Sequence, residues 1–252
     1  MKNANEVKEE MVAWIRDYFQ KSGDENTKAL IGISGGKDSA VVAAACVAAL
    51  GKDRVIGVLM PNGVQSDIAD SQRVCQILGI KNYTINIGNA YDALSEEILS
   101  KIEGTLSPQY KTNTPSRLRM VSLYGIAAII GNCRISNNGN KSERLMGYFT
   151  IWGDGAGDFA PLAHLYVSEV VAVGKALGLP SELVEKAPSD GMSGKTDEEN
   201  LGFSYEAVEN VQEGNTDGLS PEVVAMIQNR IDVMNWKVNL LNLPNFKPVC
   251  KR

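Results

Sequence analysis

The chain has 252 residues, 44% of them hydrophobic, and its 25 basic and 30 acidic residues give a net charge of -5. This length allows one large or two small domains with a sizeable core, and the negative charge gives no general attraction to nucleic acid. The N-terminus is amphipathic rather than a signal peptide and no apolar run approaches the ~20 residues that span a bilayer, so we expect one cytoplasmic α/β domain, residues 1–252, without nucleic-acid or membrane partners.

The first expected elements surround a glycine-rich turn. Apolar spacing predicts a helix from Val7 to Tyr18, and an apolar run at residues 29–33 predicts a buried strand. The turn Ser34-Gly35-Gly36-Lys37-Asp38-Ser39 follows, and the alanine-rich residues 40–50 predict a helix after it. Small residues leave backbone N–H groups accessible and a helix start is partially positive, so this turn can hold a phosphate.

The turn differs from the common phosphate-binding motifs. It has neither the P-loop spacing nor that of a dinucleotide fold, and it places an acid, Asp38, among the phosphate ligands. A Mg²⁺ ion between this carboxylate and the phosphate oxygens would remove their repulsion, which suggests ATP bound as its Mg²⁺ complex. The alternative is an ordinary glycine-rich strand-to-helix turn, which the complete S-G-G-K-D-S pattern disfavours.

The middle of the chain alternates between strand and helix patterns. Strands are expected at residues 54–60, at 83–87 and, with its loop, at 132–140; helices are expected at residues 68–78, 90–102 and 115–130. This alternation predicts a doubly wound parallel sheet that binds ligands at the carboxyl ends of its strands. The third helix is expected to begin at Pro115 and to carry an apolar stripe, Leu118, Val121, Ile126 and Ile129.

The last third is expected to contain helices at residues 168–177, 181–185 and 221–241. Residues 187–201 between them are polar and contain glycine, which is typical of a mobile lid. Four cysteines lack a C-x-x-C pair, so we expect reduced, mostly buried thiols: Cys46, Cys75, Cys133 and Cys250.

Two segments carry a family resemblance. The turn resembles the SGGxDS pyrophosphate loop of the N-type ATP pyrophosphatases, and GNKSERLMGYFTIWGDGAGDFAPL, residues 139–162, resembles more specifically the ammonia-dependent NAD synthetases. The resemblance covers nearly the whole chain. It implies the adenine-nucleotide alpha-hydrolase-like fold, a homodimer, and a lid at residues 187–201 that closes over ATP.

The resemblance also implies an activity and its ligands. The carboxylate of deamido-NAD would attack ATP to give an acyl-adenylate and pyrophosphate, and ammonia would displace AMP to leave NAD; no side-chain nucleophile is needed. Asp38 and Glu143 would bind Mg²⁺, and Arg117 and Asp158 would contact the dinucleotide. The expected ATP-binding residues are Gly32, Ile33, Ser34, Gly35, Gly36, Lys37, Asp38, Ser39, Gln65, Asn138 and Ser189.

Several positions depart from the family pattern. Family cations are replaced by Leu59, Ile151, Val167 and, near the C-terminus, Leu240-Leu241, while family threonines are replaced by Asn138 and Ser189. Each lost charge-assisted phosphate contact should cost about 1.5–3 kcal/mol. The activation of ATP is therefore expected to be retained, whereas the identity of the acceptor acid stays open.

Three functions are considered. The first is the NAD-forming ligase, the second is a divergent ligase that adenylates another carboxylic acid, and the third is a non-catalytic nucleotide-binding homologue. The third predicts erosion of Asp38 or Glu143, and both are present. No glutaminase domain is recognised, so ammonia is expected to be free or supplied by a separate partner. The apolar stripe on the helix at residues 115–130 could supply one face of the dimer.

Overall fold

A computed structural model describes residues 3–64, 68–185, 196–239 and 246–248. Within them, β1 (Lys28–Gly32), β2 (Val55–Leu59), β3 (Lys81–Thr84) and β4 (Cys133–Ile135) form a parallel sheet in the order β3-β2-β1-β4. Ala29 pairs with Val55, and Lys28 pairs with Cys133. β1 and β2 are therefore central, and their buried, apolar residues explain why a continuous apolar run marked each of them.

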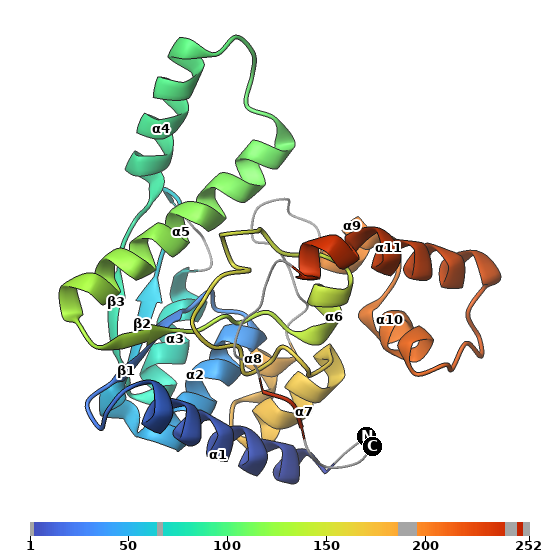
Figure 1. The fold of residues 1–252 in the computed structure, drawn as a ribbon, viewed down its shortest axis with the longest axis horizontal. Helices are drawn as coiled ribbons and strands as arrows, with labels where there is room; N and C mark the ends of the chain where they lie inside the picture. The colour runs from blue at the N-terminus through green and yellow to red at the C-terminus, as the bar shows by residue number, and fades with distance from the viewer. Residues whose placement is uncertain (1–2, 65–67, 186–195, 240–245, 249–252) are drawn as a thin grey trace.

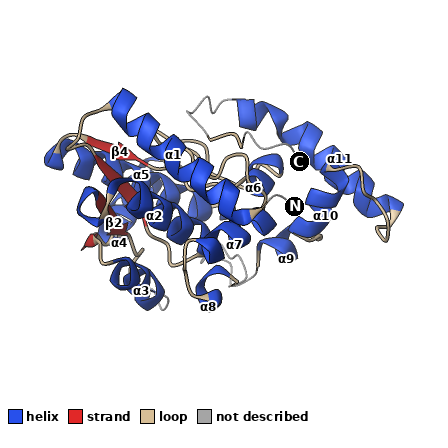
Figure 2. Cartoon of the chain, turned by 90° about the horizontal axis from the view of Figure 1, so that it is seen from below, coloured by secondary structure: helices blue, strands red, loops and turns tan. Residues whose placement is uncertain are grey.

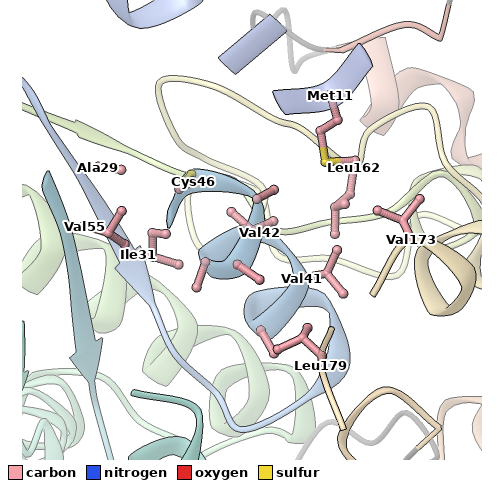
Figure 3. Close-up of a cluster of buried hydrophobic side chains, with 14 of the residues drawn as sticks. Met11, Ala29, Ile31, Val41, Val42, Cys46, Val55, Leu162, Val173 and Leu179 are labelled. Carbon is pink, nitrogen blue, oxygen red and sulfur yellow. The ribbon is translucent and has the colours of Figure 1, made fainter. Parts of the chain in front are cut away.

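One face of the sheet is covered by the N-terminal helix and the helix that follows the glycine-rich turn. α1 (Ala4–Ser22) packs against α2 (Lys37–Leu50), and both contact α7 (Val167–Ala176). Figure 3 shows Met11 of α1, Val41 and Val42 of α2, and Val173 of α7 meeting in this core. α8 (Ser181–Val184) packs on α2, and α3 (Ile68–Leu78) packs on β2. The short 3-10 helix η1 (Lys52–Arg54) precedes β2.

The opposite face is covered by α5 (Pro108–Ile130), which crosses the sheet in Figure 1. Met120 and Leu123 of α5 pack on Leu30 and Ile56 of the sheet. α4 (Gly88–Lys101) extends beside the start of α5. Helices on both faces confirm the predicted doubly wound α/β fold.

A third apolar cluster lies away from the sheet, on the right in Figure 1 and again in Figure 2. It joins α6 (Lys141–Leu145), α9 (Asp197–Leu201), α10 (Tyr205–Gln212) and α11 (Pro221–Asn239). Met146, Tyr205, Val208 and Ile227 are buried at its centre. The sequence predicted α11, but not α6 or α10 as helices.

The predicted start of α5 was wrong. The helix begins at Pro108 rather than at Pro115, because the Ser107 side chain caps it by accepting from the Tyr110 N–H at 3.1 Å. Pro115 therefore lies inside the helix. Ser107-Pro108 is a regular helix start, with a capping serine before a proline at the first helical position.

Two strand predictions are refined by the structure. β4 lies at an edge of the sheet, which explains its short and polar sequence. β3 spans Lys81–Thr84, whereas the predicted strand was residues 83–87. The backbone beyond β3 still bonds to the segment that follows β2, since the Ile87 N–H donates to the Pro61 carbonyl at 2.9 Å.

The predicted burial of the thiols is confirmed for Cys46, Cys75 and Cys133, which are free and buried; Cys250 lies outside the described residues. Burial raises the pKa of Cys75 to about 11. None of the helices in the described part of the chain combines the length and apolarity that a bilayer crossing requires.

Candidate active site

The loop between β1 and α2, residues 34–39, is called the cradle loop here. Its serines shape it: the Ser39 hydroxyl accepts from the Ser34 N–H at 3.2 Å and donates to the Gly36 carbonyl at 3.2 Å. The Ser34 and Ser39 hydroxyls lie 3.1 Å apart, and the Gly36 N–H donates to the Ser34 hydroxyl at 3.3 Å. These hydrogen bonds join residues within the loop, so the loop itself stabilises the shape of the turn.

Gly35 is required by the shape of the cradle loop. Its φ is +81°, which lies in the left-handed region, and a Cβ there would be 2.9 Å from both the Asp70 Cβ and the Ser71 N. α3 therefore packs directly against the loop. Only glycine combines this backbone conformation with so close an approach.

The helix that follows the loop presents its N-terminus to the site. Gly36 is the N-cap of α2 and has no side chain of its own to cap the helix. Helix N-terminal N–H groups lack partners within the helix and carry a partial positive charge. The end of α2 is therefore suited to an anion such as a phosphate.

Two carboxylates from distant parts of the chain are brought together beside this loop. The Asn140 side-chain N–H donates to Asp38 Oδ1 at 3.0 Å, and the Asn140 backbone N–H donates to Glu143 Oε2 at 3.1 Å. Asn140 is fully buried and begins α6 with a capping box. One asparagine thus fixes both acids.

These acids suit a cation. Burial raises the pKa of Glu143 well above its usual range, and the Asp38 carboxylate raises it further, while the Lys37 ammonium opposes this rise. The described residues contain no group of three or more acidic, His or Cys side chains arranged as a metal site. Two carboxylates nevertheless fit Mg²⁺, which keeps several waters and takes phosphate oxygens as further ligands.

Lys37 lies beside these acids, with its side chain only 3% exposed. Its Nζ is 3.0 Å from Asp38 Oδ2. Burial lowers the pKa of Lys37, but the carboxylates of Asp38, Glu143 and Asp197 together raise it above its usual value. Its role as an ATP ligand stays a prediction, because its ammonium is paired with Asp38.

The other predicted ATP-binding residues fall into two groups. Gly32 ends β1 and, with Ile33, leads into the cradle loop; the Asn138 side-chain N–H donates to the Gly32 carbonyl at 3.0 Å. Asn138 therefore lies at the carboxyl end of β1, and its contact with ATP stays a prediction. Gln65 and Ser189 lie outside the described residues, as does most of the predicted lid.

Within residues 139–162, the segment that carries the more specific family resemblance, residues 147–158 form a loop. Arg117 reaches it from α5, where its Nε donates to the Ile151 carbonyl at 3.1 Å. Asp158 accepts from the Tyr124 hydroxyl at 3.2 Å and from the Ile135 N–H at 2.8 Å. Both predicted substrate contacts thus have partners within the protein, and their roles toward a substrate stay predictions.

Two cations in this region were not among the predicted site residues. Lys237 of α11 donates to the Gly147 carbonyl at 2.6 Å and to the Phe149 carbonyl, and its Nζ lies 4.5 Å from the Phe149 ring centroid. Arg144 follows Glu143, and its Nη1 is buried without a hydrogen-bond partner among the described residues. Burial lowers the pKa of Arg144. In the sequence, the position of Arg144 directly after Glu143 was the signal that could have identified it as a site residue.

Arg144 lines a recess that also contains Glu143. The recess is small, with room for about one water molecule, and it is partly open to solvent. Its lining is completed by Asn137, Gly139, Phe149, Asp154 and Gly155. Guanidinium groups bind phosphate and carboxylate groups well, but this recess would have to widen before Arg144 could receive one.

Asp197, in the segment predicted as a lid, was also missed as a site residue. It is 4% exposed, and its Oδ2 accepts from the Tyr205 hydroxyl at 3.3 Å. Burial raises the pKa of Tyr205 most, and the charges of Glu143 and Asp197 raise it further. Asp197 also raises the pKa of Glu143, so it lies close enough to act electrostatically on that acid.

Comparison with known proteins gives consistent matches. The profile described as NAD synthase matches residues 7–242. The "NH(3)-dependent NAD(+) synthetase" of Pyrococcus furiosus is 39% identical over 202 residues, which cover 80% of this chain and 76% of the relative.

Two solved structures share the fold. The NMN synthetase from Francisella tularensis has a TM-score of 0.85 and 33% identity, and the match covers 98% of this chain and all of the other. The NH3-dependent NAD synthetase from Campylobacter jejuni has a TM-score of 0.76 and 29% identity, and the match covers the whole of both chains.

Proposed function

The chain belongs to the NAD synthase family, and we propose that it is an ATP-dependent ligase that converts the carboxylate of deamido-NAD into the amide of NAD. The observation that carries this proposal is the cradle loop at the open N-terminus of α2 with Asp38 and Glu143 beside it. Phosphate binding and a divalent cation are the two requirements of ATP adenylation, and this arrangement supplies positions for both.

The reaction proceeds in two steps. A carboxylate oxygen of the acceptor attacks the α-phosphorus of ATP, the bond to the bridging oxygen breaks, and pyrophosphate leaves. Ammonia then attacks the acyl carbon, AMP leaves, and the nitrogen loses a proton to solvent. No side-chain nucleophile takes part; the N–H groups of the cradle loop stabilise the charge that develops on the pyrophosphate.

The site is proposed to use Mg²⁺. Asp38 and Glu143 would hold it, and the bound ion supplies positive charge opposite the phosphate oxygens. The protein's own contribution is to hold the two acids together through Asn140, which donates to both. This geometry fixes the site before a ligand arrives.

A smaller acceptor is the second candidate. The Francisella tularensis neighbour is named an NMN synthetase, so the corresponding acid here would be the mononucleotide whose amide is NMN. Two positions where an apolar residue replaces a family cation support this second candidate. Val167 packs against the cluster around Met146 and Tyr205, and the Ile151 carbonyl accepts from Arg117. A dinucleotide has one more phosphate to neutralise than a mononucleotide, and Arg144 could hold a single phosphate.

The experiment is pyrophosphate release with ATP, Mg²⁺ and ammonia, measured with deamido-NAD and with the mononucleotide acid in parallel. A higher kcat/KM for deamido-NAD supports the first candidate, and the reverse order supports the second. A protein that releases no pyrophosphate with either acid, yet binds ATP, contradicts both. The products NAD and NMN are separated chromatographically, so amide formation is checked independently of ATP cleavage.

The assembly is also proposed. The four residues of the predicted stripe on α5 have two different environments. Leu118 and Ile126 pack on the protein's own core, whereas the side chains of Val121 and Ile129 are 68% and 88% exposed. Neighbouring α4 exposes Leu94 and Leu99. We expect this α4–α5 surface to form a two-fold dimer interface. Light scattering that gives a mass near 27 kDa at micromolar concentration would contradict it.

Two further proposals concern the number of domains and the cellular compartment. Because the profile match runs from residue 7 to residue 242, we propose that the chain acts as one catalytic domain. The three buried free thiols fit a reducing compartment, so we propose the cytoplasm. Trypsin digestion that separated a stable sheet fragment from α10 and α11 would contradict the single domain.

A further inference from the structure

Lys37 occupies a position where a lysine needs an explanation. It is the first residue of α2, next to the partially positive end of the helix, and its side chain is 3% exposed. Both features disfavour an ammonium group, the first through repulsion and the second through loss of hydration. The family pattern SGGxDS leaves this position variable, so phosphate binding by the loop does not demand a lysine.

The neighbours of Lys37 provide the explanation. Its Nζ lies 3.0 Å from Asp38 Oδ2, while Asp38 Oδ1 accepts from the Asn140 amide at 3.0 Å. The charges of Glu143 and Asp197 also act on the ammonium and, with Asp38, outweigh the effect of burial on its pKa. One carboxylate therefore contacts this buried cation, and two more from other segments of the chain lie near enough to act on it electrostatically.

The charge balance points to a role in the metal site. Burial raises the pKa of Glu143, but metal binding requires its ionised form. With all four groups ionised, three negative charges and one positive charge sum to -2, which a single divalent cation neutralises. Without Lys37 the same acids would sum to -3. A buried group of like charges is costly unless a counter-charge is present.

We propose that the Lys37 ammonium is a built-in cation of this site: it keeps Asp38 and Glu143 together before a divalent cation binds, and it weakens the binding of that cation. This rests on the Mg²⁺ site of the proposed function. It concerns the protein before ATP and the acceptor bind, so it is tested without turnover. A cation fixed by the fold and a cation from solution compete for the same negative charge.

The test compares thermal unfolding of the wild-type protein and Lys37→Met in EDTA and over a series of Mg²⁺ concentrations, without ATP. Methionine keeps the length and most of the volume of the side chain but removes its charge. We expect Lys37→Met to unfold at a lower temperature than wild type in EDTA, and Mg²⁺ to raise its unfolding temperature more than it raises that of wild type. The Mg²⁺ concentration at the midpoint should fall about tenfold or more in the variant. Lys21→Met, which removes an exposed lysine paired with Asp17, is the matched control and should respond to Mg²⁺ as wild type does.

An equal response to Mg²⁺ in wild type and Lys37→Met, with midpoints within about twofold, overturns the proposal. If Lys37→Met does not fold in EDTA, the double variant Lys37→Met/Asp38→Asn removes one charge of each sign and should regain stability. A double variant no more stable than the single one assigns Lys37 a packing role and overturns the proposal. Because neither ATP nor an acceptor is present, failure of the proposed ligase activity would leave these results unchanged.

Discussion

In the cradle loop the residues that fix the turn are close in sequence, whereas the 147–158 loop combines hydrogen bonds of its own with contacts from helices far along the chain. Ser34 and Ser39 are five positions apart. Arg117 is 34 positions from Ile151, and Lys237 is 90 positions from Gly147. The cradle loop is thus shaped mainly by hydrogen bonds between its own residues, and the 147–158 loop also needs contacts with α5 and α11.

The two regions also use their cations differently. Beside the cradle loop, the Lys37 ammonium pairs with a carboxylate that is a candidate metal ligand. In the 147–158 loop, Arg117 and Lys237 donate to backbone carbonyls and so hold the loop itself. Arg144 lies between the two regions, with Nη1 buried and unpartnered among the described residues. We therefore expect changes at the cradle loop to affect every acceptor equally, and changes near Arg144 to affect acceptors differently.

The largest effect is expected from Asp38→Asn and Glu143→Gln. Each removes a negative charge from the proposed metal site while keeping the shape of the side chain. Pyrophosphate release should fall at least about 100-fold with any acceptor. The control is Glu182→Gln, which neutralises an exposed acid paired with Arg73. Unchanged turnover in either site variant, with circular dichroism showing an intact fold, would remove the metal assignment.

The next effect tests the region between the two loops. Arg144→Met should raise the KM for the acceptor about tenfold or more, because a charge-assisted hydrogen bond to a phosphate contributes about 1.5–3 kcal/mol. The KM for ATP should stay the same, since the cradle loop is not altered. Arg73→Met, on the exposed surface, is the control. An equal rise in both KM values would show that Arg144 supports the fold of the site rather than the acceptor.

A smaller effect is expected from Gly35→Ala. Alanine at φ +81° is strained, and its Cβ would approach α3, so we expect a loss of about 1–3 kcal/mol in the free energy of unfolding together with a raised KM for ATP. Gly51→Ala at the other end of α2 is a close control, because its φ is +83° and no atom lies within 4 Å of the added Cβ. If both variants behave alike in the ATP assay, the close packing of α3 on the cradle loop has no influence on ATP binding.

The same contrast explains what the sequence could predict. β1, the cradle loop and α2 are contiguous and regular, so apolar runs and a local motif located them within a few residues. Asp38 was identified as an acid within the turn and Glu143 by resemblance. Their joint hydrogen bonding by Asn140 depends on α6, a five-residue helix that is too short for a periodic pattern. The start of α5 was missed because Pro115 was given more weight than the Ser107 cap.

Contacts between distant segments could not be read from the sequence. Lys237 appeared as one more polar residue of a long helix, and nothing in its neighbours indicates that it reaches the carbonyls of residues 147 and 149. Asp197 was read as part of a polar lid, yet it is buried against Tyr205. In both cases the packing of α10 and α11 beside α6 decides the contact.

The smallest expected effect decides whether Asp158 serves the fold or the acceptor. Tyr124→Phe removes the hydroxyl that donates to Asp158 at 3.2 Å and leaves the bond from the Ile135 N–H in place. If Asp158 is structural, the variant should lose about 0.5–1.5 kcal/mol of stability and keep its acceptor KM within about twofold. Tyr110→Phe, also on α5, is the control, because it removes a hydroxyl contact with Ser95 of α4. A tenfold change in acceptor KM for Tyr124→Phe alone would instead support the predicted substrate contact of Asp158.

The pH dependence of these variants gives an independent check. Burial first, and then the Asp158 charge, raise the pKa of Tyr124 to about 12, whereas an unfolded tyrosine ionises near 10. The unfolded chain therefore loses this proton first, so the wild-type protein should lose stability as the pH rises from about 10 to about 12. Tyr124→Phe lacks this group and should show a shallower decline over the same range in urea unfolding experiments. Equal slopes would mean that the pKa of Tyr124 is not raised in the folded protein, so that its hydroxyl is not buried beside Asp158 in solution. The link between α5 and the 147–158 loop would then rest on Asn113, Ser116 and Arg117, which contact Thr150, Asp154 and Ile151.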